Sequence, residues 1–210
     1  MTTNNKIELM APAGNFESLQ AALDNGCDSV YFGVEQLNMR ARASVNFTMD
    51  DLAEIAKRCE AKNVRSYLTL NTIIYDHDLS VVKTLINKAK EANITAVIAS
   101  DQAVIAMARS VGMEVHISTQ LNVTNIETIK FYSLFADTMV LSRELSLRQV
   151  KKITEQIEKE QIKGPNGNLV EIEIFGHGAL CMAVSGKCYL SLHSHNSSAN
   201  RGACKQNCRK

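Results

Sequence analysis

Short apolar runs alternate with longer amphipathic segments along almost the whole chain of 210 residues. The apolar runs are rich in Val, Ile and Leu, which is typical of strands buried in a parallel sheet. They predict seven strands, at residues 7–11, 29–33, 65–70, 96–99, 114–118, 138–141 and 170–175.

The segments between these runs carry apolar residues at helical spacing. They predict six helices, at residues 16–25, 49–62, 79–92, 102–111, 126–135 and 147–161. The residues expected to cap the starts of several helices are Asn15, Thr48 with Asp51, Ser100, Asn125 and Ser146. The residues expected to end several helices are Gly26, Asn63, Asn93 and Gly112.

Strands that alternate with helices predict an α/β fold whose parallel sheet is built by right-handed crossovers. A doubly wound sheet and a closed barrel both fit this rhythm. We favour a TIM-barrel-like (β/α) barrel, because polar residues follow nearly every strand, as they do at a barrel mouth. An eighth strand and helix are not visible, so we expect an incomplete barrel whose open edges offer a surface for homo-oligomers.

The predicted division places the barrel portion at residues 1–175 and a cysteine-rich basic segment, packed at the barrel mouth, at residues 176–210. The candidates for substrate contacts at this mouth are Asn71, Ser118, Gln120, Asn122 and Arg143. Strand ends are polar in most proteins, so capping turns explain some of these residues equally well.

Two charged pairs have both a functional and a structural interpretation. Arg143 and Glu144 could grip an anion or simply be charges at a helix start. Arg40 and Arg42 could clamp a phosphate, a carboxylate or RNA, or could belong to a solvated loop. The catalytic residue is unassigned at this point, and its candidates are His177, Gln120, Arg143 and Glu144.

Composition gives an average globular protein, with 45% hydrophobic and 21% charged residues. The first residues lack the basic and apolar regions of a secretory signal. No apolar run is long enough to span a membrane, so we expect no membrane partner. The cytoplasm is therefore the predicted location, and there cysteines are normally reduced.

Charge is distributed unevenly although the chain's formal net charge is only +1. No Asp or Glu follows Glu173, while five Lys and Arg residues give that segment +5 and leave −4 to the first 173 residues. Such a segment is typical of contact with an anionic ligand, an anionic cluster or a nucleic-acid backbone, or of a solvated tail.

Four cysteines lie in this basic segment, at positions 181, 188, 204 and 208. Structural zinc usually uses closely paired cysteines, and only the last pair resembles such a knuckle. Iron–sulfur clusters also use four thiolates and accept looser spacing. Unliganded buried thiols and disulfides remain alternatives, as does a nucleophilic Cys181 activated by His177. Cys27 and Cys59 are expected to be packing residues.

The segment from Glu173 to Ser191 resembles the signature of the collagenase-like peptidase family. That signature reads E-x-F-x-x-G-[SA]-aliphatic-C-x4-G-x-C-x-aliphatic-S, and this chain supplies every position of it. The residues concerned are Glu173, Phe175, Gly178, Ala179, Leu180, Cys181, Gly186, Cys188, Leu190 and Ser191. The stretches "ELMAPAGNFESLQAALDNGCDSVYFG", "ISTQLNVTN", "LSRELSL" and "ANRGACKQNCRK" extend the resemblance over essentially the whole chain.

The resemblance implies a TIM-barrel-like catalytic domain and one of two activities. Some members are named peptidases or collagenases, while other branches hydroxylate the tRNA wobble uridine, a ribosomal RNA cytidine or the ubiquinone ring. It also implies a four-iron four-sulfur cluster on Cys181, Cys188, Cys204 and Cys208, with zinc the lesser alternative. Similar RNA-modifying members continue well beyond the last cysteine, so we expect a fragment or a short form that completes itself by association.

The hypothesis that follows is hydroxylation of a base in RNA, most directly the tRNA wobble uridine, with prephenate as the hydroxyl donor and RNA as the partner. The alternatives are a peptidase of the same family and a truncated barrel without catalytic activity.

Overall fold

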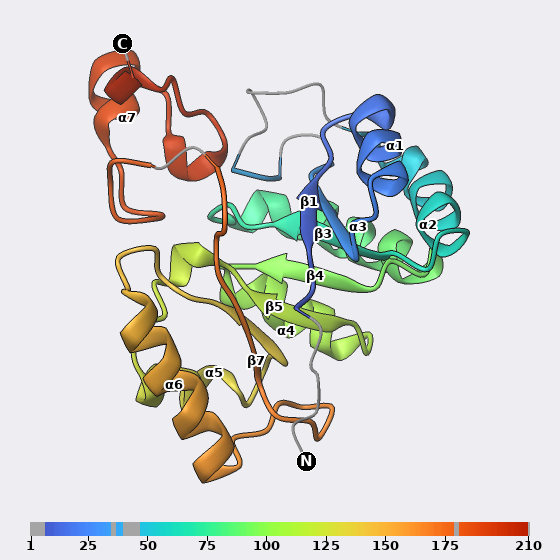
Figure 1. The fold of residues 1–210 in the computed structure, drawn as a ribbon. Coiled ribbons are helices and arrows are strands. Elements are labelled where there is room, and N and C mark those ends of the chain that lie inside the picture. Colours follow the sequence, from blue (N-terminus) through green and yellow to red (C-terminus); the bar gives the residue numbers. More distant parts are fainter. Residues whose placement is uncertain (1–6, 35–36, 40–46, 179–180, 210) are drawn as a thin grey trace.

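Seven parallel strands form one sheet that curls into a half-barrel (Figure 1). The structure, a computed structural model, describes residues 7–34, 37–39, 47–178 and 181–209. Each strand pairs with its neighbours in chain order, so β1 and β7 lie at the two edges of the described sheet. The α/β, TIM-barrel-like fold with seven visible strands is therefore confirmed.

All seven strands lie where the apolar runs predicted them, and two of them, at residues 65–70 and 96–99, have the predicted bounds. The seven strands are β1 (Met10–Pro12), β2 (Ser29–Phe32), β3 (Arg65–Leu70), β4 (Ala96–Ala99), β5 (Glu114–Ile117), β6 (Thr138–Val140) and β7 (Glu171–Glu173). The first and last predicted strands differ most. At these edges a strand has a partner on one side only, so its ladder ends sooner than its apolar run.

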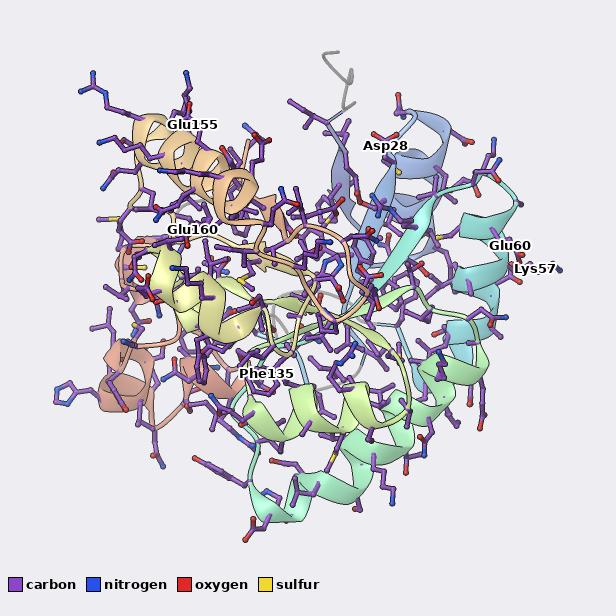
Figure 2. All side chains as sticks on the ribbon, turned by 90° about the horizontal axis from the view of Figure 1, so that it is seen from below. Asp28, Lys57, Glu60, Phe135, Glu155 and Glu160 are labelled. Atoms are coloured by element: carbon purple, nitrogen blue, oxygen red, sulfur yellow. The ribbon has the colours of Figure 1, made fainter. Side chains whose placement is uncertain are left out.

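Six helices cover the outer face of the sheet, and each follows one strand in the chain (Figure 2). They are α1 (Phe16–Asp24), α2 (Leu52–Glu60), α3 (Leu79–Glu91), α4 (Gln102–Ser110), α5 (Ile126–Tyr132) and α6 (Leu147–Glu160). Charged side chains such as Lys57 and Glu60 on α2 and Glu155 on α6 are exposed.

Local capping chemistry explains where most helices start and end. Asn15 and Asn125 accept hydrogen bonds from backbone N–H groups in the first turns of α1 and α5. The prediction of Ser100 as a cap is wrong, because Asp101 caps α4 by accepting from the Ala103 N–H. The four predicted stops, at residues 26, 63, 93 and 112, all have positive φ.

The two faces of the sheet differ in chemistry. The main apolar core lies between the sheet and its helices and includes fully buried residues such as Leu68 and Val97. A smaller cluster on the other face joins Tyr67, Ala96 and Ile98. The buried His116 lies beside it, with its ring centre 4.6 Å from that of Tyr67. The inner face is therefore the more polar one.

The segment after β7 contains a short helix that the sequence pattern did not predict, α7 (Leu190–His195). Short 3-10 turns complete the structure: η1 (Met49–Asp51), η2 (Asp76–Asp78), η3 (Thr119–Leu121), η4 (Ala199–Arg201) and η5 (Asn207–Arg209). In the described part of the chain, no helix has the length and apolar character needed to cross a membrane.

Candidate functional site

Polar side chains at the carboxyl ends of β3 and β5 form one hydrogen-bonded group. The Asn71 side-chain Nδ2 lies 3.2 Å from Gln120 Oε1 and 3.3 Å from Ser118 Oγ. Ser118 Oγ also donates to Gln120 Oε1. All strands of the parallel sheet end at the same side, and β3 and β5 flank β4. This brings Asn71 to Ser118 and Gln120, which are 47 and 49 positions away in the chain.

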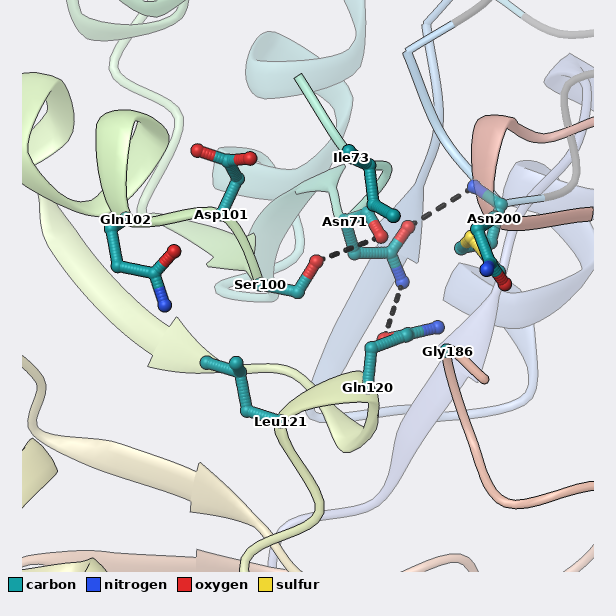
Figure 3. A pocket seen from close by; sticks show the side chains of 10 residues that line it. Asn71, Ile73, Ser100, Asp101, Gln102, Gln120, Leu121, Gly186 and Asn200 are labelled. Carbon is teal, nitrogen blue, oxygen red and sulfur yellow. Dashed lines mark hydrogen bonds between the residues drawn. The ribbon is translucent and has the colours of Figure 1, made fainter. Parts of the chain in front are cut away.

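A cavity of about 280 Å³ opens beside this group and is called here the amide cavity (Figure 3). It lies between the ends of β3, β4 and β5 and the segment after β7. Its lining residues are Met39, Asn71, Ile73, Ser100, Asp101, Gln102, Gln120, Leu121, Gly186 and Asn200. Four of these ten are Asn or Gln, so amide groups dominate the polar part of the wall.

Ser185 and Gly186 bring the segment after β7 against the ends of β5 and β6. The Asn122 side chain donates to the Ser185 carbonyl oxygen at 2.9 Å, and Arg143 Nη2 donates to Ser185 Oγ at 2.7 Å. Gly186 has φ of +70°, and a Cβ there would lie 3.0 Å from Gln120 Cβ. Only glycine fits this close approach without strain.

A second cavity, of about 230 Å³, lies between the start of α6 and the residues that follow β7. We call it the Arg143 cavity. Its lining residues are Leu141, Ser142, Arg143, Leu145, Leu147, Val150, Ile174, Phe175, Gly176, His177 and Gly178. The Arg143 guanidinium carbon lies 5.9 Å from the centre of the Phe175 ring. The structure therefore separates the predicted mouth residues into two groups, on either side of Ser185.

A second contact attaches the C-terminal segment to the loop that precedes α3. Arg201 forms an ion pair with Asp78, donates to the Ile73 carbonyl oxygen at 2.8 Å, and lies 4.3 Å above the Tyr75 ring. The Ile73 N–H in turn donates to the Asn200 carbonyl oxygen at 3.1 Å. These bonds position Asn200 at the wall of the amide cavity.

The remaining predicted site residues have different surroundings. Glu144 is exposed, and a hydrogen bond from Ser142 lowers the pKa of its carboxyl group, so it is ionised at neutral pH. His177 is exposed and lines the Arg143 cavity. Arg40 and Arg42 lie outside the described residues.

The six cysteines fall into two classes. Cys27 and Cys59 are buried packing residues, as expected, and burial raises the pKa of the Cys59 thiol to about 11. Cys181, Cys204 and Cys208 are exposed, and Cys188 is half-buried. All six are free thiols, so the disulfide alternative is wrong for this structure.

A four-iron four-sulfur cluster needs its thiolates around one point. Among the described residues, which include all four cysteines of the C-terminal segment, no three Cys, His, Asp or Glu side chains form a group that could hold a metal ion. The thiols as placed do not fit a cluster, so we derive no chemical step through one. The cluster stays a prediction.

The sequence did not indicate several residues of the site as candidates. Ser185, Asn200 and Arg201 contact the strand ends through hydrogen bonds that span 63 to 128 positions. Their only signal is their place inside the motif segments. The sequence did not indicate His116 as a candidate either. It sits inside an apolar strand, where alternation puts it on the inner face, 3.0 Å from the Glu114 carboxylate.

Glu173, the first residue of the signature, also lies at this inner face. Burial raises the pKa of its carboxyl group, and the nearby His116 partly offsets that effect. Its Oε2 atom is buried and has no hydrogen-bond partner among the described residues. The carboxyl group is therefore held where its protonated form is favoured.

The family model described as "Peptidase family U32" matches residues 14–210, which is nearly the whole chain. The match includes both cavities and the four cysteines of the C-terminal segment.

Curated relatives carry two kinds of name. A protein named collagenase from Porphyromonas gingivalis is 59% identical over 98% of this chain and 50% of its own length. An uncharacterized protease of Methanocaldococcus jannaschii is 44% identical over 97% of this chain and 48% of its own. A tRNA hydroxylation protein of Bacillus subtilis is 33% identical over 97% and 46%. The chain thus spans about half the length of these relatives.

Among solved structures, one described as a U32 peptidase superposes with a TM-score of 0.61, over 83% of this chain and 69% of the other. Its sequence identity is 13%, so this likeness bears on the fold alone.

Proposed function

The chain belongs to peptidase family U32, and from this premise we propose that it hydrolyses peptide bonds at the carboxyl ends of its strands. The observation that carries the proposal is the 59% identity, over 98% of the chain, to a protein named collagenase. The 44% identity to a protein named as a protease supports the same activity. Relatives named for tRNA hydroxylation share less of the sequence, at 33% for the Bacillus subtilis protein.

His177 is the group best suited to move a proton. Among the described residues that line the two cavities, only Asp101, Arg143 and His177 have titratable side chains. Both carboxylate oxygens of Asp101 accept backbone N–H groups, from Ile74 and Ala103. Arginine keeps its proton in proteins. Histidine can both take and give a proton near neutral pH.

The proposed reaction uses His177 and Arg143, which both line the Arg143 cavity. His177 accepts a proton from water as the water oxygen attacks the peptide carbonyl carbon. Arg143 stabilises the negative charge that forms on the carbonyl oxygen. The carbon–nitrogen bond then breaks, and the proton passes from His177 to the leaving amine, which yields a carboxylic acid and an amine; the acid then gives its proton to the amine or to solvent.

The experiment incubates the purified chain with gelatin and identifies new peptide ends by mass spectrometry. We expect cleavage by the wild-type chain and loss of cleavage in His177→Ala. The variant Lys187→Ala is a suitable control, because in the described structure Lys187 lines neither cavity. Intact gelatin after incubation with a folded wild-type chain would contradict the proposal.

Hydroxylation of a base in RNA is a second candidate function. The specific observation in its favour is the C-terminal segment, which has five positive charges and no Asp or Glu after Glu173. The relative from Bacillus subtilis supports it as well. The sequence resemblance implies a cluster on Cys181, Cys188, Cys204 and Cys208, with prephenate as hydroxyl donor, and this candidate requires the four thiols to come closer together than they lie here.

Two measurements test this second candidate. One is the iron and sulfide content of the chain after anaerobic purification, compared with a Cys188→Ala variant. The other is mass spectrometry of tRNA nucleosides from a strain that lacks the protein. A colourless, iron-free chain together with unchanged tRNA nucleosides would contradict RNA hydroxylation.

A further inference from the structure

The orientation of the Asn71 side chain follows from one backbone group. The Met39 N–H can only donate, and it lies 3.1 Å from the side-chain oxygen of Asn71. This contact settles which end of the amide is oxygen, a choice that is otherwise made from the hydrogen-bond network. The Asn71 nitrogen must therefore point the other way, toward Ser118 and Gln120.

The same reasoning determines the orientation of the Gln120 side-chain amide. Its side-chain oxygen accepts hydrogen bonds from Asn71 Nδ2 and from Ser118 Oγ. Because the oxygen is held by two donors, the amide nitrogen must lie on the opposite branch of the side chain. In Figure 3 that nitrogen points away from Asn71. Within the described residues, the N–H groups of Gln120 donate no hydrogen bond. Because Gln120 lines the amide cavity, they are available to a ligand there.

We propose that Gln120 binds substrate by donating its side-chain N–H to a main-chain carbonyl of a peptide in the amide cavity, and that Asn71 fixes the polarity of this donor. The inference rests on the proposed peptidase function and specifies how that function recognises its substrate. Asn71 is a positioning residue in this scheme, because it acts through Gln120.

The composition of the cavity wall favours a peptide over a nucleotide. Proteins bind unpaired bases by stacking them on aromatic or arginine side chains and bind phosphates with Lys and Arg. Among the described residues, no aromatic, lysine or arginine side chain lines the amide cavity. Its apolar residues, Met39, Ile73 and Leu121, suit the side chains of an extended peptide, while its neutral amides suit the main chain.

Isosteric variants directly test which end of the Gln120 amide, the nitrogen or the oxygen, faces the amide cavity. Gln120→Glu keeps an oxygen for the Asn71 and Ser118 donors but replaces the donating nitrogen with an acceptor. Asn71→Asp still accepts from the Met39 N–H but presents a second carboxylate oxygen to Gln120 in place of the donating nitrogen. That oxygen attracts the Gln120 N–H, so the amide is expected to turn and to present its oxygen to the cavity. Gln149→Glu is the control, because it makes the same change at an exposed residue of α6 that lines neither cavity, and glutamate can still accept the hydrogen bonds from Ser146.

Binding of an end-capped Gly-Pro-Ala peptide is measured by calorimetry, and gelatin cleavage is followed in parallel. We expect Gln120→Glu and Asn71→Asp each to weaken peptide binding by about tenfold, the effect of one lost hydrogen bond of ordinary strength. Gln149→Glu changes binding by less than about twofold, because it lies outside the amide cavity. In cleavage assays Gln120→Glu and Asn71→Asp raise KM more than they lower kcat.

The outcomes separate this inference from the proposed function. If the wild-type chain binds and cleaves peptides and Gln120→Glu does so equally well, the inference is wrong and the peptidase function stands. If peptide binding depends on Gln120 but no cleavage occurs, the peptidase function is wrong and the binding site stands. If uridine binds in a Gln120-dependent manner and the peptide does not, both are overturned in favour of base recognition.

Discussion

The amide cavity and the Arg143 cavity lie at the same end of the sheet but differ in chemistry. The first has neutral amides whose hydrogen bonds define which atoms face the ligand. The second has a guanidinium and an exposed imidazole beside apolar side chains. Neutral, oriented groups suit recognition of a main chain, and titratable groups suit proton transfer. Ser185 and Gly186 lie between the two cavities and contact residues of both.

The largest effect is expected from His177→Ala, which removes the titratable imidazole of the Arg143 cavity. Loss of a general base usually lowers turnover by about 10²- to 10⁴-fold. Peptide binding in the amide cavity is expected to stay within about twofold, because His177 does not line it. Gelatin cleavage and calorimetry on one preparation measure both quantities. Equal losses in both would show that the two cavities act as one.

Gly186→Ala should disturb both cavities together. Alanine at φ of +70° costs roughly 1–3 kcal/mol, and its methyl group would press on Gln120. The strain also acts on the preceding Ser185, which Arg143 holds. We expect a lower free energy of unfolding in urea, together with weaker peptide binding and slower cleavage. Gly167→Ala is the matched control, since its φ of +81° imposes similar backbone strain, while no atom beyond its chain neighbours lies within 4 Å of a Cβ there and it lines neither cavity.

Asp78→Asn should loosen the wall of the amide cavity and leave the Arg143 cavity unchanged. The hydrogen bond from Arg201 lowers the pKa of the Asp78 carboxyl below its usual 3.8. The ion pair therefore stabilises the fold above pH 3.8, and this contribution is lost as pH falls through the lower pKa of the folded state.

Because asparagine can still accept a hydrogen bond from Arg201, we expect the variant to lose about 1 kcal/mol at neutral pH. Chemical unfolding across the acid range measures this difference, which should shrink as pH falls below 3.8. A difference between variant and wild type that stays constant down to strongly acidic pH would contradict the role of the Asp78 charge.

The smallest effect is expected from Cys181→Ala and Cys188→Ala on gelatin cleavage. In the described structure, neither cysteine lines either cavity, and both are free thiols. Cleavage rates within about twofold of the wild type are therefore expected. A strong loss in Cys181→Ala alone would instead support the nucleophilic cysteine that the nearby His177 suggested.

Most of the fold follows from local patterns in the sequence. Strand and helix positions agree because apolar periodicity records burial, and four helices end at the expected Gly and Asn residues. The errors are local. Asp101 rather than Ser100 caps α4, because the aspartate side chain reaches the Ala103 N–H while Ser100 donates to the Asn71 carbonyl oxygen.

The candidate site was predicted only in part. Asn71, Gln120 and Arg143 were named because they follow strands, and the structure places each of them at a cavity wall. The sequence did not indicate that they line two separate cavities. It also did not indicate Asn200 and Arg201 as partners of the loop before α3, because contacts over more than 120 positions leave no periodic signal.

The sequence by itself determined the alternation of strands and helices, the helix ends and the motif segments. Each of these depends on residues within a few positions of one another. The tertiary structure alone decided which polar side chains meet, and which way the Gln120 amide points. That direction depends on Met39, Asn71 and Ser118, which come from three separate connections and meet only once the sheet has curled.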